Sequence, residues 1–444
     1  MPQSKAKKFT PAIRLRGWLG KLTAYLKALG PGLIAGAADD DPSGIGTYVQ
    51  TGAQFGYAQL WTALFTFPLM TAVQEMCARL ALHTGRGLTD IIREHYPKPI
   101  LYVCVLLLFT ANTINLGVDL GAMAASCQML LPLPLGSWLI AFALLTALLE
   151  IFVSYTQYAR VLRLLTLSLF AYVLVAFVVS QDWGQVLRST FIPTMQFRQE
   201  YVLNLVAVLG TIISPYLFFW QASEEVEEEI NAGKTTLAAR QGISRTELRW
   251  MRTDVTSGML FSNLVMWFII VTTASTLFRH GITNIDSAPK AVEALRPIAG
   301  RFASVLFAAG IVGSGLLAVP ILAGSAAYAV AETFTWREGL YLRLRQAPGF
   351  YGVIAFATGL GAATNLVGIN PIKALFYTAV LNGLVAPPLL WLILLMSNNR
   401  AILQEKVNGQ VANILGWVTA LAMTMAAVAL LCTLFLSSHV VDSG

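Results

Sequence analysis

A run of three aspartates that ends at Asp41 stands in the middle of the first apolar segment of the chain, residues 33–55. A charge at the centre of a lipid bilayer is costly and is seldom retained without a use. Pro42 has no amide hydrogen and Gly44 weakens a helix, so they should interrupt the helix and leave backbone carbonyl groups unpaired. Carboxylates beside unpaired carbonyl groups at membrane depth predict a cation site, in which Asp41, Ser43 and Gly44 supply ligands.

The first two aspartates of this run, Asp39 and Asp40, cannot point the same way as Asp41 on a helix with 3.6 residues per turn. We expect one of them to line the pathway of the ion and the other to pair with a basic or polar neighbour. A purely structural role, as buried hydrogen-bonding groups, is an equally open alternative for both.

Only one other apolar segment is interrupted in the same way, the sixth, at residues 201–229. There Pro215 follows Ser214, whose hydroxyl group would join the backbone carbonyl groups of Ile212 and Ile213 as a ligand. These are hard oxygen donors, which suit Mg2+, Ca2+ and Mn2+, whereas sulfur and imidazole ligands select later metals. Neither break contains a methionine, cysteine or histidine, and all four histidines lie outside the expected membrane interior.

Polar residues in two further segments are candidates for lining the pathway. Asn112, Asn115 and Asp119 follow one another at spacings of three and four, so they share one face of the third segment. Asp119 is the only carboxylate of that segment, which favours a role in the pathway. Asn382 in the tenth segment is a weaker candidate, because a buried amide more often joins helices together.

Five glutamates between Glu224 and Glu229 form an acidic run where the sixth segment should leave the membrane. The helix dipole disfavours negative charge at this end of a helix. A vestibule that collects or releases cations would explain the run. A solvated helix end is the simpler interpretation and the one that we expect.

The composition predicts an all-helical integral membrane protein. Only 12% of the 444 residues are charged, against about 25% in soluble domains, while 56% are hydrophobic and the mean hydropathy is +0.65. The basic first residues lack a short apolar run with a cleavage site, so no removable signal peptide is expected. A span needs about 20 apolar residues, and we expect eleven, near residues 33–55, 58–80, 100–125, 135–156, 161–180, 201–229, 254–277, 302–330, 350–364, 372–396 and 411–436.

The net charge of +7 does not indicate nucleic acid binding, because the basic residues gather in alternate loops. With the N-terminus in the cytoplasm, 23 of the 30 Lys and Arg residues lie on the inner side and six on the outer side, as the positive-inside rule predicts. We therefore expect a multi-pass protein of the cell membrane with its N-terminus in the cytoplasm and its C-terminus outside. The expected partners are divalent metal ions and the lipid bilayer, and the oligomeric state stays open.

Two broken helices, the first and the sixth, are typical of transporters built from two repeats of opposite topology, with the binding site where the breaks meet. The expected division is a basic tail at residues 1–28, a first repeat at 29–182, a second repeat at 200–397 and an additional helix at 410–436. The alternative is a pair of independent proline kinks in packed helices.

Four short motifs surround the first break: Leu-Gly-Pro-Gly at residues 29–32, Asp-Pro at 41–42, Gly-Ala-Gln-Phe-Gly-Tyr at 52–57 and Leu-Trp at 60–61. Together they resemble the first two helices of Nramp-type divalent metal transporters. The likeness extends weakly from about residue 29 to the last span. It implies a LeuT-type fold of two inverted five-helix repeats with an eleventh helix.

The chain departs from the family pattern at both breaks. Ser43 and Gly44 stand where the family motif Asp-Pro-Gly-Asn has glycine and asparagine. Ser214 and Tyr216 replace the methionine and the histidine of the family motif Met-Pro-His. Gln221 stands at the position of a second family histidine, so Tyr216 and Gln221 are candidates for the pathway or for coupling.

The resemblance implies an importer of divalent cations that works by alternating access and is not an enzyme. Without the thioether and asparagine ligands, the site should be wider and should admit a partly hydrated ion, which fits Mg2+ best. The pattern resembles the Nramp-related magnesium transporters, which implies transport of Mg2+ and also Mn2+, without a cofactor and without the usual proton coupling.

Alternatives to this function remain open. Asp119 matches a carboxylate that the family associates with proton movement, so one alternative is a proton-coupled transporter of Mn2+ or Fe2+. A second alternative is a sodium-coupled symporter of an organic solute with the same fold. A non-transporting receptor or scaffold would explain the spans, but it would leave the two broken helices without a purpose.

Overall fold

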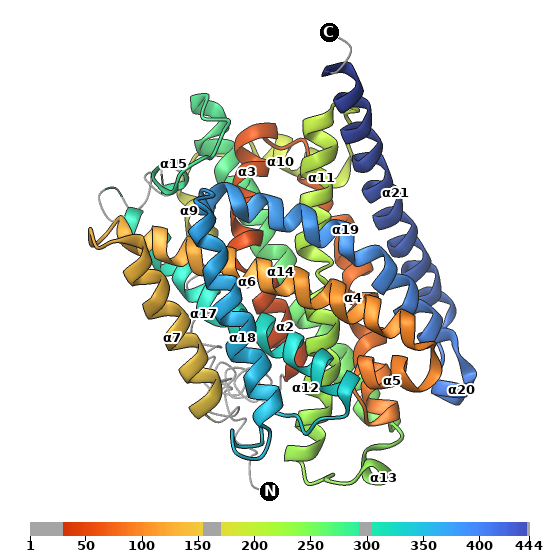
Figure 1. Ribbon diagram of the computed structural model, residues 1–444. Coiled ribbons are helices and arrows are strands. Elements are labelled where there is room, and N and C mark those ends of the chain that lie inside the picture. Colours follow the sequence, from red (N-terminus) through yellow and green to blue (C-terminus); the bar gives the residue numbers. More distant parts are fainter. Residues whose placement is uncertain (1–29, 154–169, 293–299, 301–302, 442–444) are drawn as a thin grey trace, which may run out of the picture.

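The computed structural model describes residues 30–153, 170–292, 300 and 303–441, and every regular element in these ranges is a helix (Figure 1). The first half of the chain contains α2 (Pro31–Asp39), α3 (Pro42–Phe55), α4 (Trp61–Thr84), α5 (Leu88–His95), α6 (Lys98–Gln128), α7 (Leu135–Phe152), α9 (Phe170–Val178) and α10 (Trp183–Phe191). The second half contains α11 (Gln199–Ile212), α12 (Pro215–Asn231), α13 (Leu237–Arg240), α14 (Arg245–Thr276), α15 (Ala288–Val292), α17 (Ala303–Phe334), α18 (Pro348–Thr364), α19 (Pro371–Asn398), α20 (Arg400–Leu403) and α21 (Gln410–Val441).

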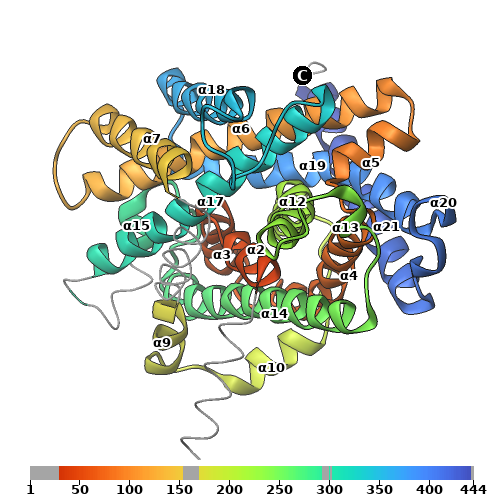
Figure 2. The same cartoon turned by 90° about the horizontal axis from the view of Figure 1, so that it is seen from below.

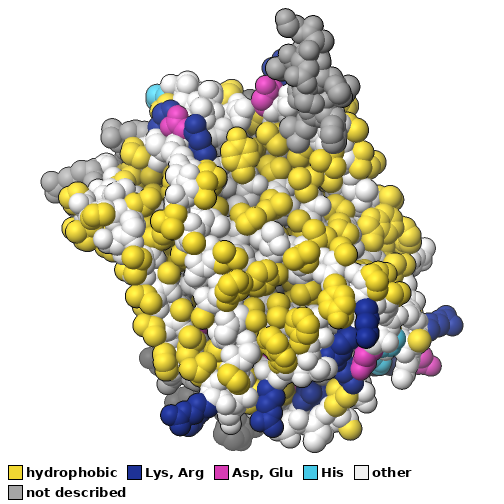
Figure 3. Space-filling view, in the orientation of Figure 1, with side chains coloured by type: hydrophobic (Ala, Val, Ile, Leu, Met, Phe, Trp, Pro, Cys, Tyr) yellow, Lys and Arg dark blue, Asp and Glu magenta, His cyan; other side chains and the backbone are white. Residues whose placement is uncertain are grey.

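The long helices confirm an all-helical protein of the membrane type. Eight helical segments of the described chain are long and apolar enough to cross a bilayer. Ten of the eleven expected spans coincide with described helices. The first nine residues of the fifth, 161–180, lie outside the described residues, and its described part contains only the nine-residue α9. The count of eleven therefore stays a prediction. Apolar side chains cover the middle of the face shown in Figure 3, and Lys and Arg side chains gather toward its lower rim.

The two expected breaks have the same backbone turn. At the first break, Asp40 has φ −85° and ψ 50°, and Asp41 is extended with φ −67° and ψ 169°. At the second break, Ile213 has φ −105° and ψ 60°, and Ser214 is extended with φ −82° and ψ 125°. In both, a proline begins the next helix, where its missing N–H group leaves no helical hydrogen bond unmade. The interruption expected at both prolines is confirmed.

The broken first helix packs closely against α14. A Cβ atom on Gly36 would lie 2.1 Å from the carbonyl oxygen of Gly258, and one on Gly52 would lie 1.9 Å from the hydroxyl oxygen of Thr273. Such close approach of helix backbones requires residues without side chains. Figure 2 shows α2, α3 and α12 near the centre of the molecule, with α14 on one side and α17 on the other.

Asp254 of α14 holds the first turn of α2. Its Oδ1 accepts hydrogen bonds from the backbone N–H groups of Gly30 and Leu33 at 2.8 and 3.3 Å, and its Oδ2 accepts one from Gly32 at 2.7 Å. The first N–H groups of a helix have no partner within the helix and carry partial positive charge. A carboxylate at this position therefore stabilises the helix and ties α2 to α14.

Candidate metal site at the two helix breaks

Asp41 is the N-cap of α3, and its carboxylate is held on both oxygens. Oδ1 accepts hydrogen bonds from the Gly44 backbone N–H at 2.6 Å and from the Ser43 hydroxyl at 2.8 Å. Oδ2 accepts one from the amide of Asn115 in α6 at 2.9 Å. Asp41 is only 2% exposed, so these contacts orient a carboxylate that water does not reach freely.

Gly44 leaves little unused space beside this carboxylate. A Cβ atom at this position would lie 3.1 Å from the backbone oxygen of Asp39 and 3.2 Å from Oδ1 of Asp41. Both distances are short for such contacts, so a side chain here would crowd two oxygen atoms that face the break. A glycine at this position avoids that crowding.

Asp39 and Asp40 face a different helix from Asp41. The hydroxyl of Ser262 in α14 donates a hydrogen bond to Oδ2 of Asp39 at 2.6 Å and lies 3.5 Å from Oδ1 of Asp40. The second oxygens, Oδ1 of Asp39 and Oδ2 of Asp40, are buried without a hydrogen-bond partner among the described residues. The side chains of the three aspartates thus point in two directions: Asp41 faces α6, whereas Asp39 and Asp40 face α14.

The second break faces the first through Tyr216. The Tyr216 hydroxyl donates a hydrogen bond to the backbone oxygen of Ala38, in the last turn of α2, at 2.8 Å. The Ser214 hydroxyl donates to the backbone oxygens of Gly210 and Thr211 at 3.0 and 2.5 Å, which leaves its lone pairs for an ion. Tyr216 therefore occupies one carbonyl group at the end of α2 and joins the two broken helices.

Each break keeps a backbone carbonyl group available. The carbonyl oxygens of Asp40 and Ile213, the residues at which α2 and α11 end, accept no hydrogen bond from any residue that the structure describes. Ile212 is the last residue of α11. Unpaired carbonyl groups within a membrane are tolerated where they line a cavity or meet an ion.

Asp119 lies one helical turn beyond Asn115 on α6. The Asn115 amide is 3.5 Å from Oδ2 of Asp119, and Oδ1 of Asp119 has no partner among the described residues. Asn112, on the same face, donates instead to the backbone oxygen of Leu322 in α17 at 3.2 Å. The structure therefore connects Asp119 to Asp41 through one amide, and it gives Asn112 a helix-packing role.

Two expected pathway residues form no hydrogen bond with the residues of the breaks in the described structure. Gln221 lies about two turns along α12 from Ser214, where its amide donates to Glu225 at 2.8 Å. Asn382 is buried in α19, and its amide nitrogen has no partner in the described part of the chain.

The expectation of a solvated acidic run on α12 is wrong. Four of its glutamates are only 0–7% exposed, and Glu228 alone is exposed: the buried members are Glu224, Glu225, Glu227 and Glu229. Hydropathy could not reveal this burial, because the groups that cover these side chains come from other parts of the chain. Glu227, for example, accepts hydrogen bonds from Tyr328 and from the backbone of Leu340.

The sequence interpretation missed two polar residues within the spans. Ser262 was not singled out, because serines in apolar helices commonly bond to their own backbone and carry no signal of their own. Glu150 of α7 is 4% exposed, and its Oε1 has no hydrogen-bond partner within the described residues. The position of Glu150 within the expected fourth span, residues 135–156, was a signal by which the sequence could have identified it.

The donor set at the breaks consists of carboxylate, hydroxyl, amide and carbonyl groups. Among the described residues, no group of three His, Cys, Asp or Glu side chains is placed to hold a metal ion. An ion beside Asp41 would therefore depend on neutral oxygen ligands and on water. This arrangement suits a hard cation that retains part of its hydration shell.

A cavity of about 450 Å3 lies on the upper side of Figure 1, between α3, α11 and α19. Its lining includes Gly46 and Gln50 of α3, Glu200 of α11, and Lys373 and Tyr377 of α19. Gly46 lies one turn of α3 above Asp41. Among its lining residues, Gly46 is the one nearest in sequence to the first break.

Residues 32–433 match the family described as natural resistance-associated macrophage protein-like, or Nramp. The chain is 27% identical over 421 residues to the divalent metal cation transporter MntH of Deinococcus radiodurans, and the match covers 91% of this chain and 90% of that protein. It is 26% identical over 428 residues to the protein of the same name from Bacillus subtilis, with 94% of each chain covered.

Solved structures confirm the expected fold class. The chain is similar to the manganese transporter of Eremococcus coleocola, with a TM-score of 0.68, 18% identity, and coverage of 91% of this chain and 86% of that chain. It is also similar to Mhp1, a nucleobase-cation-symport-1 family transporter, with a TM-score of 0.51, 13% identity, and coverage of 90% and 91%. At these identities the likeness shows the fold alone.

Proposed function

Because the chain belongs to the natural resistance-associated macrophage protein (Nramp) family, we propose that it imports divalent cations across a membrane by alternating access. The relatives compared above are named transporters and not enzymes. The observation that carries the proposal is the pair of matching helix breaks, with the Asp41 carboxylate at one and the unpaired Ile213 carbonyl group at the other.

The proposed ligands come from both breaks. Asp41 supplies the carboxylate, the backbone around Ser43 and Gly44 supplies oxygen atoms and space, and Ser214 supplies its hydroxyl oxygen. Carbonyl groups of the sixth helix, at Ile212 and Ile213, complete the protein ligands. Water supplies the rest, which is consistent with the absence of a three-ligand acidic cluster among the described residues.

We propose Mg2+ as a substrate alongside Mn2+. Sulfur ligands favour manganese and later metals over magnesium, and Ser214 stands where the family resemblance places a methionine. Mg2+ gives up its water reluctantly and is usually bound through one or two carboxylates with several waters retained. Asp41 offers a single carboxylate, and Gly44 adds no side chain beside it.

Transport without proton coupling is part of the same proposal. Tyr216 and Gln221 stand at two positions where the resemblance places histidines. The Tyr216 hydroxyl donates a hydrogen bond to the backbone oxygen of Ala38, and the Gln221 amide donates one to Glu225. Uptake would then depend on the concentration gradient and the membrane voltage. Two positive charges gain about 5 kcal/mol on moving through 100 mV.

The cell membrane is the proposed location, with the N-terminus in the cytoplasm and the C-terminus outside. The matching backbone angles at the two breaks support two repeats of opposite topology, at residues 29–182 and 200–397. In this orientation the lower side of Figure 1 faces the cytoplasm, and the cavity beside Gln50 is the entry for the ion.

Substitution of Asp41 tests the proposed site. We expect Asp41→Ala and the isosteric Asp41→Asn to reduce Mg2+ and Mn2+ uptake into proteoliposomes to background, because each removes the only carboxylate charge assigned to the ion. Asp286→Ala is the matched control, since Asp286 pairs with Lys290 near the surface. Unchanged uptake in a folded Asp41→Asn protein would show that the ion binds elsewhere.

A proton-coupled Mn2+ transporter is the second candidate. The observation that favours it is the connection of Asp119 to Asp41 through the Asn115 amide, which places a second buried carboxylate one turn from the proposed ligand. A pH-sensitive dye inside proteoliposomes separates the two candidates. Acidification that accompanies Mn2+ uptake, together with a lack of Mg2+ uptake, would select the proton-coupled transporter.

A further inference from the structure

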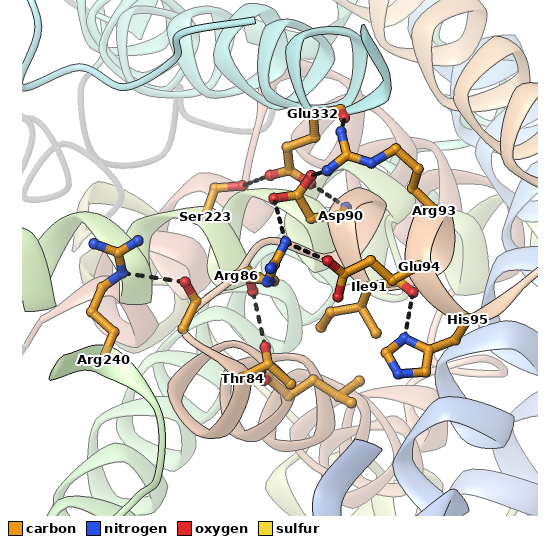
Figure 4. A network of polar contacts seen from close by, with 12 residues as sticks. Thr84, Arg86, Asp90, Ile91, Arg93, Glu94, His95, Ser223, Arg240 and Glu332 are labelled. Carbon is orange, nitrogen blue, oxygen red and sulfur yellow. Dashed lines mark hydrogen bonds and ion pairs between the residues drawn. The ribbon is translucent and has the colours of Figure 1, made fainter. Parts of the chain in front are cut away.

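A second cavity, which is lined by several carboxylates, lies on the lower side of the molecule, away from the helix breaks. It has a volume of about 220 Å3 and four carboxylates in its lining: Asp90 of α5, Glu227 of α12, Glu332 of α17 and Glu338 of the segment that follows α17. Figure 4 shows Asp90, Glu332 and Ser223 close together, with Arg86 and Arg93 beside them. None of these carboxylates belongs to the proposed transport site.

Glu227 presents one oxygen to the protein and keeps the other without a partner. Its Oε1 accepts hydrogen bonds from the Tyr328 hydroxyl at 2.6 Å and from the Leu340 backbone N–H at 2.7 Å. Its Oε2 has no hydrogen-bond partner among the described residues, although Glu227 is only 2% exposed. A buried carboxylate oxygen without a partner is costly, and a cation in the cavity would offset that cost.

Glu338 adds a second unsatisfied oxygen to the same cavity. Its Oε2 is buried without a hydrogen-bond partner within the described residues. Burial raises the pKa of the Glu338 carboxyl well above its usual range, and the neighbouring carboxylates of Glu332, Asp90 and Glu227 raise it further. These carboxyl groups therefore lie close enough to one another to influence each other's ionisation.

Glu332 is held rigidly at the wall of the cavity. Its Oε2 accepts a hydrogen bond from the Asp90 backbone N–H at 3.0 Å, and its Oε1 lies 3.3 Å from the Ser223 hydroxyl (Figure 4). A Cβ atom on Gly87 would lie 1.8 Å from Oε1 of Glu332. The carboxylate therefore occupies space that only a glycine at position 87 leaves free.

The neighbouring arginines are engaged by other groups. Arg86 pairs with Glu94 at 2.7 Å and lies 3.8 Å from Asp90, while Arg93 pairs with Asp90 at 2.7 Å. None of the ion pairs found in the described residues includes Glu227, Glu332 or Glu338: the acidic members of those pairs are Glu75, Asp90, Glu94, Glu229, Glu247 and Asp286.

Arg240 also lines the cavity, but its guanidinium group is directed to backbone oxygens. It donates hydrogen bonds to the carbonyl groups of Gly85, Lys234 and Thr235 at 3.2 Å each. Arg93 donates a hydrogen bond to the backbone oxygen of Glu332, but no carboxylate of the three glutamates forms an ion pair with a basic side chain in the described structure. The lining contains four acidic side chains and two arginines, Arg86 and Arg240, so a bound cation would improve its charge balance.

We propose that this cavity binds a hydrated divalent cation between Glu227, Glu332 and Glu338. Since no three acidic side chains of the described chain are placed to hold a bare ion, the ion keeps water molecules and is held by carboxylate oxygens through them. Mg2+ commonly binds in this way. A volume of about 220 Å3 accommodates an ion with several waters.

The site has a consequence for transport, which rests on the proposed function. Glu227 lies on α12, the lower half of the broken sixth helix, whereas Glu332 lies on α17 and Glu338 on the segment beyond it. A cation between them would tie α12 to its neighbours on the cytoplasmic side. Cations accumulated in the cytoplasm would therefore slow inward opening and limit further uptake.

Binding of Mn2+ to the full-length chain in detergent tests the site without transport, because the electron paramagnetic resonance signal of free Mn2+ falls on binding. We expect the Asp41→Ala protein to retain about one Mn2+ per chain. Adding Glu338→Gln to it should weaken this binding at least tenfold, and adding Glu227→Gln should do the same. Glu94→Gln is the matched control, because Glu94 pairs with Arg86 and does not line the cavity.

Two results would overturn the inference: no Mn2+ bound to a folded Asp41→Ala chain, or equal weakening of Mn2+ binding by Glu94→Gln and by Glu338→Gln.

Uptake by proteoliposomes with and without internal Mg2+ then tests the regulatory consequence. We expect internal Mg2+ to slow uptake by wild type severalfold and by Glu338→Gln much less. Binding without any uptake would contradict the transport function alone, whereas uptake without the second binding site would contradict this inference alone.

Discussion

Asp41 combines structural and chemical roles at a single residue. It caps α3 through the Gly44 N–H group, and it accepts a hydrogen bond from Asn115 of α6. An N-cap carboxylate needs an extended backbone, and the break supplies it. The same geometry leaves Asp41 pointing away from its two neighbours, Asp39 and Asp40, which face Ser262.

Gly44 provides a test of selectivity at the residue scale. We expect Gly44→Asn to lower Mg2+ uptake at least tenfold relative to Mn2+ uptake, because a side chain there would lie against Asp39 and Asp41 and displace water from the ion. Competition between the two ions during uptake measures the ratio. Gly44→Ala is the matched control: it narrows the space without adding a ligand, so it should lower Mg2+ uptake without improving Mn2+ uptake. An unchanged ratio in Gly44→Asn would contradict a hydrated ion at this position.

At the scale of helices, the half-helix α2 is held at both of its ends. Asp254 binds the N–H groups of its first turn, and Tyr216 binds a carbonyl group of its last turn. Between these ends, Gly36 and Gly258 bring the backbones of α2 and α14 together. In the proposed alternating-access cycle such half-helices move, so we expect these contacts to limit how readily the lower side opens.

Asp254→Asn tests the contact at the start of α2. Hydrogen bonds to a charged group contribute about 1.5–3 kcal/mol, so we expect amide hydrogens in the first turn of α2 to exchange at least tenfold faster in the variant. Hydrogen–deuterium exchange with mass spectrometry measures this. Thr253→Ala is the control, because the Thr253 hydroxyl bonds only to the backbone of its own helix at Arg249. Equal exchange in Asp254→Asn and wild type would mean that packing alone holds α2.

At the scale of the whole molecule, the two cavities lie on opposite sides of the helix breaks. The cavity beside Gln50 lies above the breaks, Asp41 lies at their level, and the acidic cavity around Glu227 lies below. Apolar side chains cover the middle of the surface in Figure 3. Asp41 and Glu227 are thus buried in the interior, whereas the middle of the face in Figure 3 is mainly apolar.

Voltage dependence is the prediction that belongs to this scale. Uptake of a divalent cation without a coupled proton moves two charges inward, so a negative internal potential of 100 mV should favour it by about 5 kcal/mol at equilibrium. We expect initial uptake into proteoliposomes to rise when a potassium gradient with valinomycin makes the interior negative. The internal pH should stay constant. Uptake at a rate independent of the membrane voltage would require a counter-ion and would contradict uncoupled transport.

Much of the architecture could be predicted from the sequence. The spans follow from the length of apolar segments, and ten of them coincide with described helices. Both breaks were expected at Pro42 and Pro215, because the loss of an N–H group is a property of the residue itself. The burial of the acidic run on α12 was not expected, since its covering groups, such as Tyr328, lie about a hundred residues away.

The sequence by itself determined that this chain is a helical membrane protein with two interrupted helices and a carboxylate at one interruption. Those features are local, since they depend on hydropathy and on proline. Only the tertiary structure decided which way each carboxylate faces. Asn115 reaches Asp41 across 74 residues of chain, and Ser262 reaches Asp39 across 223. The direction of a buried side chain follows from hydrogen-bond partners that other helices supply, and no local pattern specifies them.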